Sequence, residues 1–201
     1  MKTIFNKLLI FLFSAFVSIS FAQTKTNLEI FYALTDTLVD QINSELPASK
    51  NEILLRLNNG NIYSVFNNNI KTTFINSGKK IFDIPPDELN IPTVDIVIES
   101  ASVHYGDVFK DGWFGSYYTT RNFSVQGNYL QTFSDNGKQE FNLSYTDTIM
   151  VDQISELENN SFPFTKGEIP SEPFLSGLTE PILAIGTAAA MVILFFSVRS
   201  K

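Results

Sequence analysis

The spacing of apolar residues near the start of the chain predicts a long amphipathic helix. Apolar side chains recur every three to four positions from Phe31 to Leu46, which is the spacing that gathers them on one helix face. Thr26 precedes Glu29 by three residues, the pattern of a capping box at a helix start. Pro47 follows the run, and proline does not continue a helix. We therefore expect the first helix between Thr26 and Pro47.

Three shorter elements are predicted next. The apolar run at 52–57 (EILLRL) indicates a short buried strand. An apolar residue at every fourth position from Ile62 to Phe74 predicts a second helix, with Gly78 suited to the left-handed cap after its last turn. Residues 79–84 then alternate like a strand, and two prolines end the alternation.

From Thr93 onward the hydrophobic period changes to two. Apolar and polar residues alternate at 94–105, 123–129 and 141–145, which is typical of half-buried strands. Asn136-Gly137 lies between the last two runs and favours a tight hairpin turn. The order αβαβ followed by a β-meander predicts an α+β fold with two helices packed on a mostly antiparallel sheet.

The amino-terminal residues have the pattern of a secretory signal peptide. Lys2 and Lys7 precede an uncharged run from Leu8 to Phe21, and the small residues Ser20 and Ala22 occupy the −3 and −1 positions before Gln23. The run is shorter than the roughly 20 residues that span a ~30 Å hydrocarbon layer. Cleavage after residue 22 is therefore favoured over a permanent anchor. The chain has no cysteine, which excludes disulfides and an acylated amino-terminal cysteine.

A second uncharged run near the carboxyl terminus predicts a transmembrane helix. Residues 181–198 (PILAIGTAAAMVILFFSV) carry no charge and are followed by Arg199 and Lys201. At about 1.5 Å per residue the run would cross a thin bilayer. The basic residues after it place the last three residues in the cytoplasm by the positive-inside rule.

These ends divide the chain into five predicted parts, with the folded domain in the periplasm or outside the cell. The parts are a signal peptide at 1–22, an extracytoplasmic domain at 23–151, a proline-containing tether at 152–180, a transmembrane helix at 181–198 and a cytoplasmic tail at 199–201.

Small residues within the predicted transmembrane helix suggest a packing surface. They recur four positions apart, as helix-packing motifs require: Ala184, Gly186, Ala188 and Ala190. The helix is either a monomeric anchor or a surface through which two copies form a homo-oligomer.

The charge balance limits the classes of partner. The chain has 14 Lys and Arg against 21 Asp and Glu, a formal net charge of −7. Several of the basic residues lie at the two ends, so the domain itself is acidic. An acidic surface argues against nucleic acid as a partner.

The element order resembles the small periplasmic α/β domains of the CsgG, LpoB and TolB amino-terminal type. The opening helix and strand at 33–57 (ALTDTLVDQINSELPASKNEILLRL) and the hairpin at 122–145 (NFSVQGNYLQTFSDNGKQEFNLSY) carry the likeness. The resemblance implies a non-enzymatic domain that assembles, regulates or bridges envelope machinery. This chain departs from those families in one respect: CsgG and LpoB are anchored at the amino-terminal end, whereas this chain is predicted to be anchored at the carboxyl-terminal end.

Candidate chemistry is confined to the region between Glu99 and Asp111. His104 is the only histidine, and with Glu99, Asp107 and Asp111 it could supply imidazole and carboxylate ligands for a divalent metal. The alternative is a histidine at a strand surface. No nucleophile elbow and no glycine-rich phosphate loop are present in the sequence, so we assign no catalytic residue, cofactor or metal.

An aromatic segment is the candidate contact surface. Residues 111–118 (DGWFGSYY) place Trp113, Phe114, Tyr117 and Tyr118 between glycines, and Arg121 follows. Trp, Tyr and Arg are favoured anchors of binding energy, although the same aromatics could fold back on the core. The sequence thus predicts a non-catalytic, membrane-anchored envelope protein whose domain binds a protein partner. The alternative is a membrane-tethered enzyme or metal-binding protein that uses the Glu99–Asp111 region.

Overall fold

A computed structural model describes residues 24–47, 50–85, 91–112, 115–132, 137–171 and 179–199. The predicted signal peptide at 1–22 lies outside the described residues. The helices and strands are α2 (Asn27–Glu45), β1 (Glu52–Leu57), α3 (Val65–Asn76), β2 (Lys80–Phe82), β3 (Thr93–Tyr105), β4 (Phe109–Lys110), β5 (Tyr117–Gln131), β6 (Lys138–Met150), the 3-10 turn η1 (Val151–Gln153), α4 (Ile154–Leu157), the 3-10 turn η2 (Pro163–Thr165) and α5 (Thr179–Arg199).

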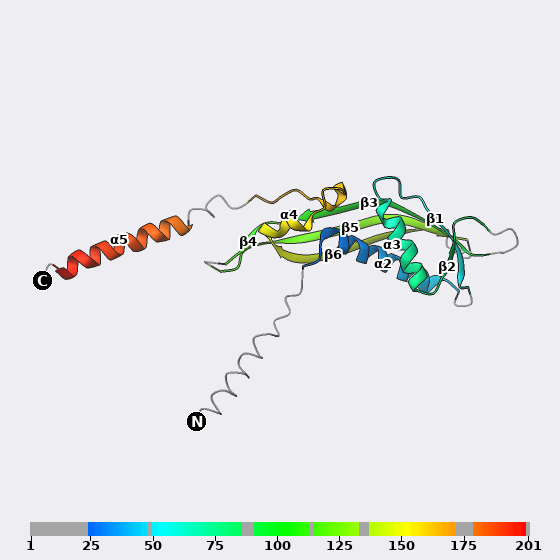
Figure 1. The fold of residues 1–201 in the computed structure, drawn as a ribbon, viewed down its shortest axis with the longest axis horizontal. Coiled ribbons are helices and arrows are strands. Elements are labelled where there is room, and N and C mark those ends of the chain that lie inside the picture. The colour runs from blue at the N-terminus through cyan, green and yellow to red at the C-terminus, as the bar shows by residue number, and fades with distance from the viewer. Residues whose placement is uncertain are drawn as a thin grey trace, which may run out of the picture.

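The chain forms an α+β domain in which α2 and α3 lie across one face of a six-stranded sheet (Figure 1). Strand β1 runs parallel to its neighbours β2 and β3. The long strands β3, β5 and β6 are antiparallel to one another, and the short β4 pairs with the start of β5. The sheet is therefore mixed, with its antiparallel part carrying most of the pairing.

The capping box predicted for α2 is present. The Thr26 hydroxyl accepts a hydrogen bond from the Glu29 backbone N–H, and the Glu29 carboxylate accepts one from the Thr26 N–H. These two bonds satisfy donors that a helix start otherwise leaves open. The apolar face of α2 is buried on the sheet along its whole length, as the spacing of its apolar residues predicted.

Helix α3 also follows the predicted pattern and buries Phe66, Ile70 and Phe74. Gly78 has a φ of +83° directly after the helix, and the Lys79 N–H bonds back to the Phe74 carbonyl. This is the left-handed ending that glycine adopts without steric cost.

A bulge in β3 keeps its apolar residues on the helix side of the sheet. The register with β5 shifts between Ile98 and Ser100, which reverses the alternation. Ile98 before the bulge and Ala101 after it are consequently both buried. Gly127 lies opposite, where an added Cβ would come within 2.1 Å of the Val97 carbonyl oxygen. Only glycine fits this close approach of two backbones.

Aromatic rings fill the centre of the core. Phe31 of α2 makes edge-on contacts with Phe123 of β5 and Phe164 of η2, with ring centroids 5.2 and 5.3 Å apart. Phe66 of α3 lies 5.1 Å from Phe164. Such tilted and edge-on pairs add to the stabilisation from burial alone.

The first part of the predicted tether is packed on the domain. Ile154, Leu157 and Phe164 are buried in the same core cluster, and Thr165 is fully buried. We refer to residues 151–171 as the strap. Its buried residues follow neither the helix nor the strand period, so the sequence pattern did not reveal this packing.

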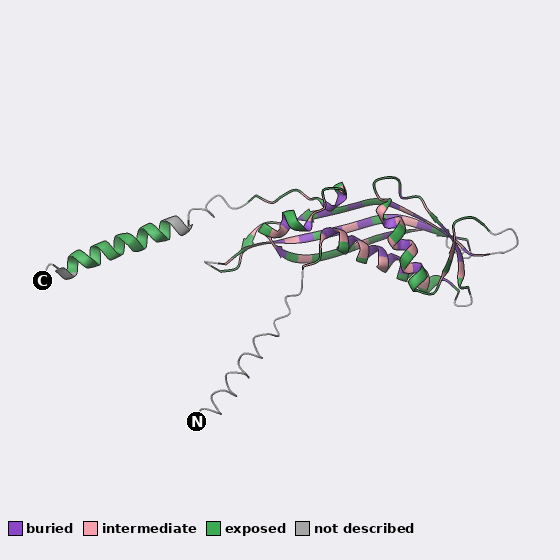
Figure 2. Ribbon diagram, in the orientation of Figure 1, coloured by how far each residue is buried: buried purple, intermediate pink, exposed green. Residues whose placement is uncertain are grey.

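The predicted transmembrane helix is corrected by the structure. Residues 179–199 do form a helix, α5, and its described side chains are exposed (Figure 2). Within the described residues, however, no helix combines the length and the apolarity needed to cross a membrane. The predicted cytoplasmic tail and the oligomer through this helix lose their support with it.

The packing of the strap is tested by replacing Phe164 with alanine. We expect Phe164→Ala to lower the free energy of unfolding by about 3–5 kcal/mol, because it removes a buried ring from four aromatic contacts. Phe162→Ala, in the same segment but only half-buried, should cost clearly less. Urea unfolding measures both. Equal, small losses would show that the strap does not belong to the core.

Candidate functional site

The predicted aromatic segment lies at the β4–β5 hairpin, at the end of the sheet away from α3 and β2 (Figure 1). Phe109 of β4 and Tyr118 of β5 stack with ring centroids 6.0 Å apart and planes 25° apart. Phe109 is 48% exposed, so this aromatic pair faces solvent. Trp113 and Phe114 lie outside the described residues.

The hairpin is anchored on both sides of its tip. The Asp111 N–H bonds to the Ser116 carbonyl, and Gly112 takes a φ of +73°. Lys110 places its ammonium 5.0 Å from the centroid of the Tyr117 ring, within the range of a cation–π contact. Phe109 and Tyr118 thus lie on one face of the paired strands, and Lys110 and Tyr117 lie on the other.

Arg121 is fully buried and is not part of this surface. Its Nε and Nη2 donate to the two carboxylate oxygens of Asp147 at 2.9 and 2.7 Å. Its Nη1 donates to the Asn27 side-chain oxygen at 2.6 Å and to the Lys25 carbonyl at 3.1 Å. Bidentate, charge-assisted bonds of this kind are among the strongest in proteins. The guanidinium ties α2 to β5 and β6.

The same network reaches the strap through Asn27 and Tyr105. Asn27 donates to the Tyr105 hydroxyl and to the Thr165 carbonyl, and the Tyr105 hydroxyl donates to Glu158 at 3.1 Å. Glu158 also accepts from the Gly167 N–H. Burial raises the pKa of Tyr105 to about 12, with the Glu158 carboxylate adding to the rise. Polar side chains on four elements and the strap thus form one buried cluster.

The alternation along β5 carried a signal for this burial. Arg121 has the same parity as Phe123 and Val125, which face the core. An arginine on an apolar strand face needs a buried partner. The partner, Asp147, lies opposite it in the pairing of β5 with β6. Sequence reasoning placed Arg121 beside the aromatic segment and missed this register.

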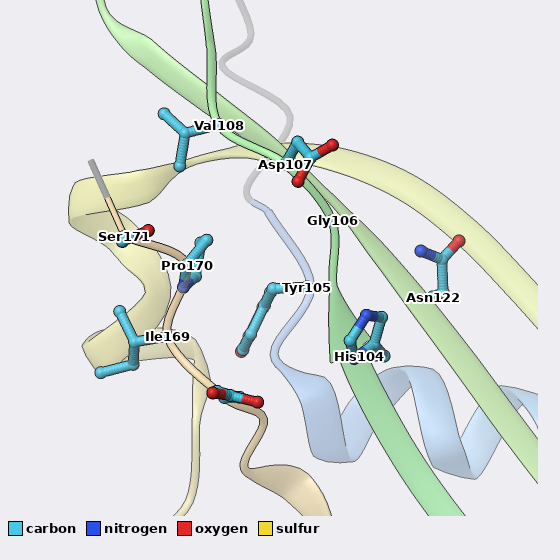
Figure 3. A pocket seen from close by; sticks show the side chains of 10 residues that line it. His104, Tyr105, Gly106, Asp107, Val108, Asn122, Ile169, Pro170 and Ser171 are labelled. Atoms are coloured by element: carbon cyan, nitrogen blue, oxygen red, sulfur yellow. The ribbon is translucent and has the colours of Figure 1, made fainter. Parts of the chain in front are cut away.

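A surface pocket of about 610 Å³ lies between the end of β3 and the strap (Figure 3). His104 and Asn122 border it on one side, and Ile169 and Pro170 of the strap border it on the other. Of the ionisable groups that line it, Tyr105 is buried, whereas His104, Asp107 and Glu168 are exposed to solvent.

The predicted metal ligands do not converge in the described residues. His104 and Glu99 are on the same strand, five residues or about 16 Å apart at strand rise. Glu99 instead bonds to the Asn128 amide. Nowhere in the described ranges do three His, Asp or Glu side chains gather closely enough to hold a metal ion.

The four small residues singled out in the last helix, Ala184, Gly186, Ala188 and Ala190, are all exposed on α5. An added Cβ at Gly186 meets no atom within 4 Å. Their role in helix packing remains a prediction.

One feature that the sequence reasoning missed is the open face of the sheet. The side chains of β5 and β6 that point away from the helices are mostly uncharged and polar: Thr120, Asn122, Ser124, Gln126, Asn128, Asn142, Ser144, Thr146 and Thr148. In the sequence, the polar residues that alternate with the apolar ones in β5 and β6 indicated this surface. They give a hydrogen-bonding surface with little charge beside the free edge of β6.

Comparison with known proteins finds one weakly similar solved structure to report. The sequence matches no known family and no curated protein. The solved structure of the rare lipoprotein B from Shewanella oneidensis is similar over 75% of this chain and 96% of that chain, with 11% sequence identity and a TM-score of 0.29. A TM-score of this size carries no argument about the fold or the function of this chain.

The buried network is tested by removing its central cation. Arg121→Ala should lower the free energy of unfolding by about 3–5 kcal/mol, because it leaves Asp147 and Asn27 without their buried partner. Arg56→Ala is the matched control. Its pair with Asp95 is 3.9 Å long and largely exposed, so about 1 kcal/mol or less should be lost. Equal effects in thermal unfolding would refute a structural role for the Arg121 network.

The raised pKa of Tyr105 predicts a loss of stability at high pH. The folded state holds the Tyr105 proton more tightly than the unfolded chain, whose tyrosines titrate near pH 10. The contribution of Tyr105 to the free energy of unfolding is therefore complete below about pH 10. That contribution is lost as the pH rises through about 12. Burial also raises the pKa of Tyr129 to about 12, so both tyrosines contribute to the loss of stability of the wild type at high pH.

Tyr105→Phe separates the two tyrosines. The variant should show a shallower fall in unfolding free energy between about pH 10 and 12 than the wild type. Tyr129→Phe should also show a shallower fall than the wild type, because burial raises the pKa of Tyr129 to about 12. Urea unfolding at several pH values measures the slopes, and identical slopes for all three proteins would contradict the assignment.

Proposed function

We propose that this chain is a non-catalytic protein of the cell envelope whose α+β domain binds a protein partner through the β4–β5 hairpin. The stack of the exposed Phe109 on the half-buried Tyr118 is the observation that carries the proposal. Aromatic side chains bury large areas at little entropic cost, and a few of them supply most of the energy of a typical interface. The anchored strands hold these rings in place before binding, which lowers the cost of association.

The non-catalytic part of the proposal is supported by where the polar groups lie. Catalytic acids and bases are tuned by burial and by close charged neighbours. His104, Asp107 and Glu168, which line the pocket, are exposed to solvent rather than buried. The buried Arg121 already bonds to Asp147 and the Lys25 carbonyl, and the buried Tyr105 bonds to Asn27 and Glu158. They hold the fold together.

The envelope location is supported by the amino-terminal pattern. Two lysines, a short uncharged run and a small-residue exit are typical of secretion signals. The acidic balance of the chain is compatible with a protein partner and unfavourable for nucleic acid.

The proposal is tested by photo-crosslinking from the hairpin in living cells. A benzophenone amino acid at Phe109 should give a discrete crosslinked product that contains one other envelope protein. The same probe at Ile62, which is 63% exposed before α3, is the matched control and should not give that product. Identical products from both positions would reject the hairpin as the contact.

A binding assay with the identified protein supplies the second measurement. Tyr118→Ala should weaken binding about 30-fold or more, as loss of an aromatic hot spot of ~2 kcal/mol does. The far-ultraviolet circular dichroism spectrum should stay unchanged. Undiminished affinity in a folded Tyr118→Ala variant would overturn the proposal.

A further inference from the structure

The outer edge of β6 is a long free sheet edge. Strand β6 pairs with β5 over its full length from Lys138 to Met150. Within the described part of the chain, no backbone group of β6 bonds to any element other than β5. Figure 1 shows β6 beside β5, on the side away from β3. A free edge of this length is a template for pairing with another strand.

The direction of each backbone group in β6 follows from the pairing of β5. The Gly106 N–H bonds to the Thr120 carbonyl, and the Thr132 N–H bonds to the Thr93 carbonyl. Even-numbered residues of β5 therefore point their backbone groups toward β3. Their even-numbered partners in β6, such as Ser144 opposite Ser124, must point theirs outward. The outward groups are those of residues 138, 140, 142, 144, 146 and 148.

This edge lacks the features that usually prevent pairing. Strand β6 contains no proline, and its register with β5 is unbroken. Edge strands are commonly protected by charges, prolines or bulges. Lys138 and Glu140 lie at one end, and the remaining charged residue, Asp147, is bonded to Arg121. The central residues 141–146 are uncharged.

The helix-side face of β6 is incompletely covered at this edge. Leu143 is half-buried, and Tyr145 is 45% exposed although its ring lies 6.3 Å from Phe123. Apolar side chains beside unpaired backbone groups gain from a neighbouring strand that covers them.

We propose that a second copy of this chain occupies the edge, through antiparallel pairing of β6 with β6 about a two-fold axis at Leu143. This register places apolar residues opposite apolar residues on the helix side. Leu143 faces Leu143 of the other copy, and Phe141 faces Tyr145. On the open face the opposed pairs are polar: Asn142 with Ser144, Glu140 with Thr146, and Lys138 with Thr148.

The self-complementarity of β6 is the reason for choosing a second copy over an unrelated strand. A two-fold axis requires that one sequence match its own reverse. Around Leu143 that condition holds on both faces, and no like charges oppose each other. The even-numbered residues form the hydrogen-bonded pairs, so Leu143 falls in a non-hydrogen-bonded pair, where side chains are closest.

The dimer is independent of the proposed partner contact. Strand β4 joins the sheet on the β3 side of β5, whereas β6 lies on the other side. Pairing through β6 therefore leaves the β4–β5 hairpin free in each copy. The dimer would present two hairpins, which raises avidity for a repeating partner.

Cysteine crosslinking tests the register, because the chain contains no native cysteine. In the full chain, Leu143→Cys should form a disulfide-linked dimer under mild oxidation, since Cα atoms about 4.5 Å apart permit the bond. Gln126→Cys, exposed on the neighbouring strand β5, is the matched control and should remain monomeric. Absence of a Leu143→Cys dimer, or equal crosslinking of both variants, would overturn the proposal.

A proline at Ser144 tests the pairing itself. The Ser144 N–H points outward, so Ser144→Pro removes an edge donor without breaking the ladder to β5. Sedimentation of the full chain in a fixed mild detergent should give a dimer for the wild type and Ser144→Ala, and a monomer for Ser144→Pro. Circular dichroism should be unchanged. A monomeric wild type, or a dimer that persists in folded Ser144→Pro, would refute pairing through β6, whatever the outcome of hairpin crosslinking.

Discussion

The buried guanidinium of Arg121 is the interaction on which the arrangement of this domain depends. It joins the start of α2 to β5 and β6, and Asn27 extends the same network to Tyr105 and the strap. An unpaired charge in the interior is costly, so these elements are stable only when all of them are in place. The apolar core supplies most of the driving force, and the network selects which segments meet.

The core and the Arg121 network leave two margins of the sheet free for interactions. The β4–β5 hairpin extends from one end, with Phe109 stacked on Tyr118. The outer edge of β6 runs along one side, with Tyr145 half-exposed beside unpaired backbone groups. Neither margin contributes much to the core. Changes there should therefore alter binding more than folding, which is the usual position of interaction sites on a rigid scaffold.

Local patterns were sufficient to predict the regular elements. The capping box before α2, the glycine after α3 and the period-two strands all follow from contacts between residues close in sequence. The prediction failed where long-range contacts decide. The strap was taken for a tether because Ile154, Leu157 and Phe164 have no regular spacing, and only the shape of the core explains their burial. The apolar run of α5 predicted a helix correctly and a membrane span wrongly.

The sequence by itself determined the α+β class, the main helices and strands, and the aromatic content of the hairpin, because propensity, capping and periodicity act over a few residues. The tertiary structure alone decided the parallel pairing of β1, the burial of Arg121 against Asp147 and the free edge of β6. Those features depend on which strand lies beside which. Strand order is set by packing across the whole sheet, and no local pattern specifies it.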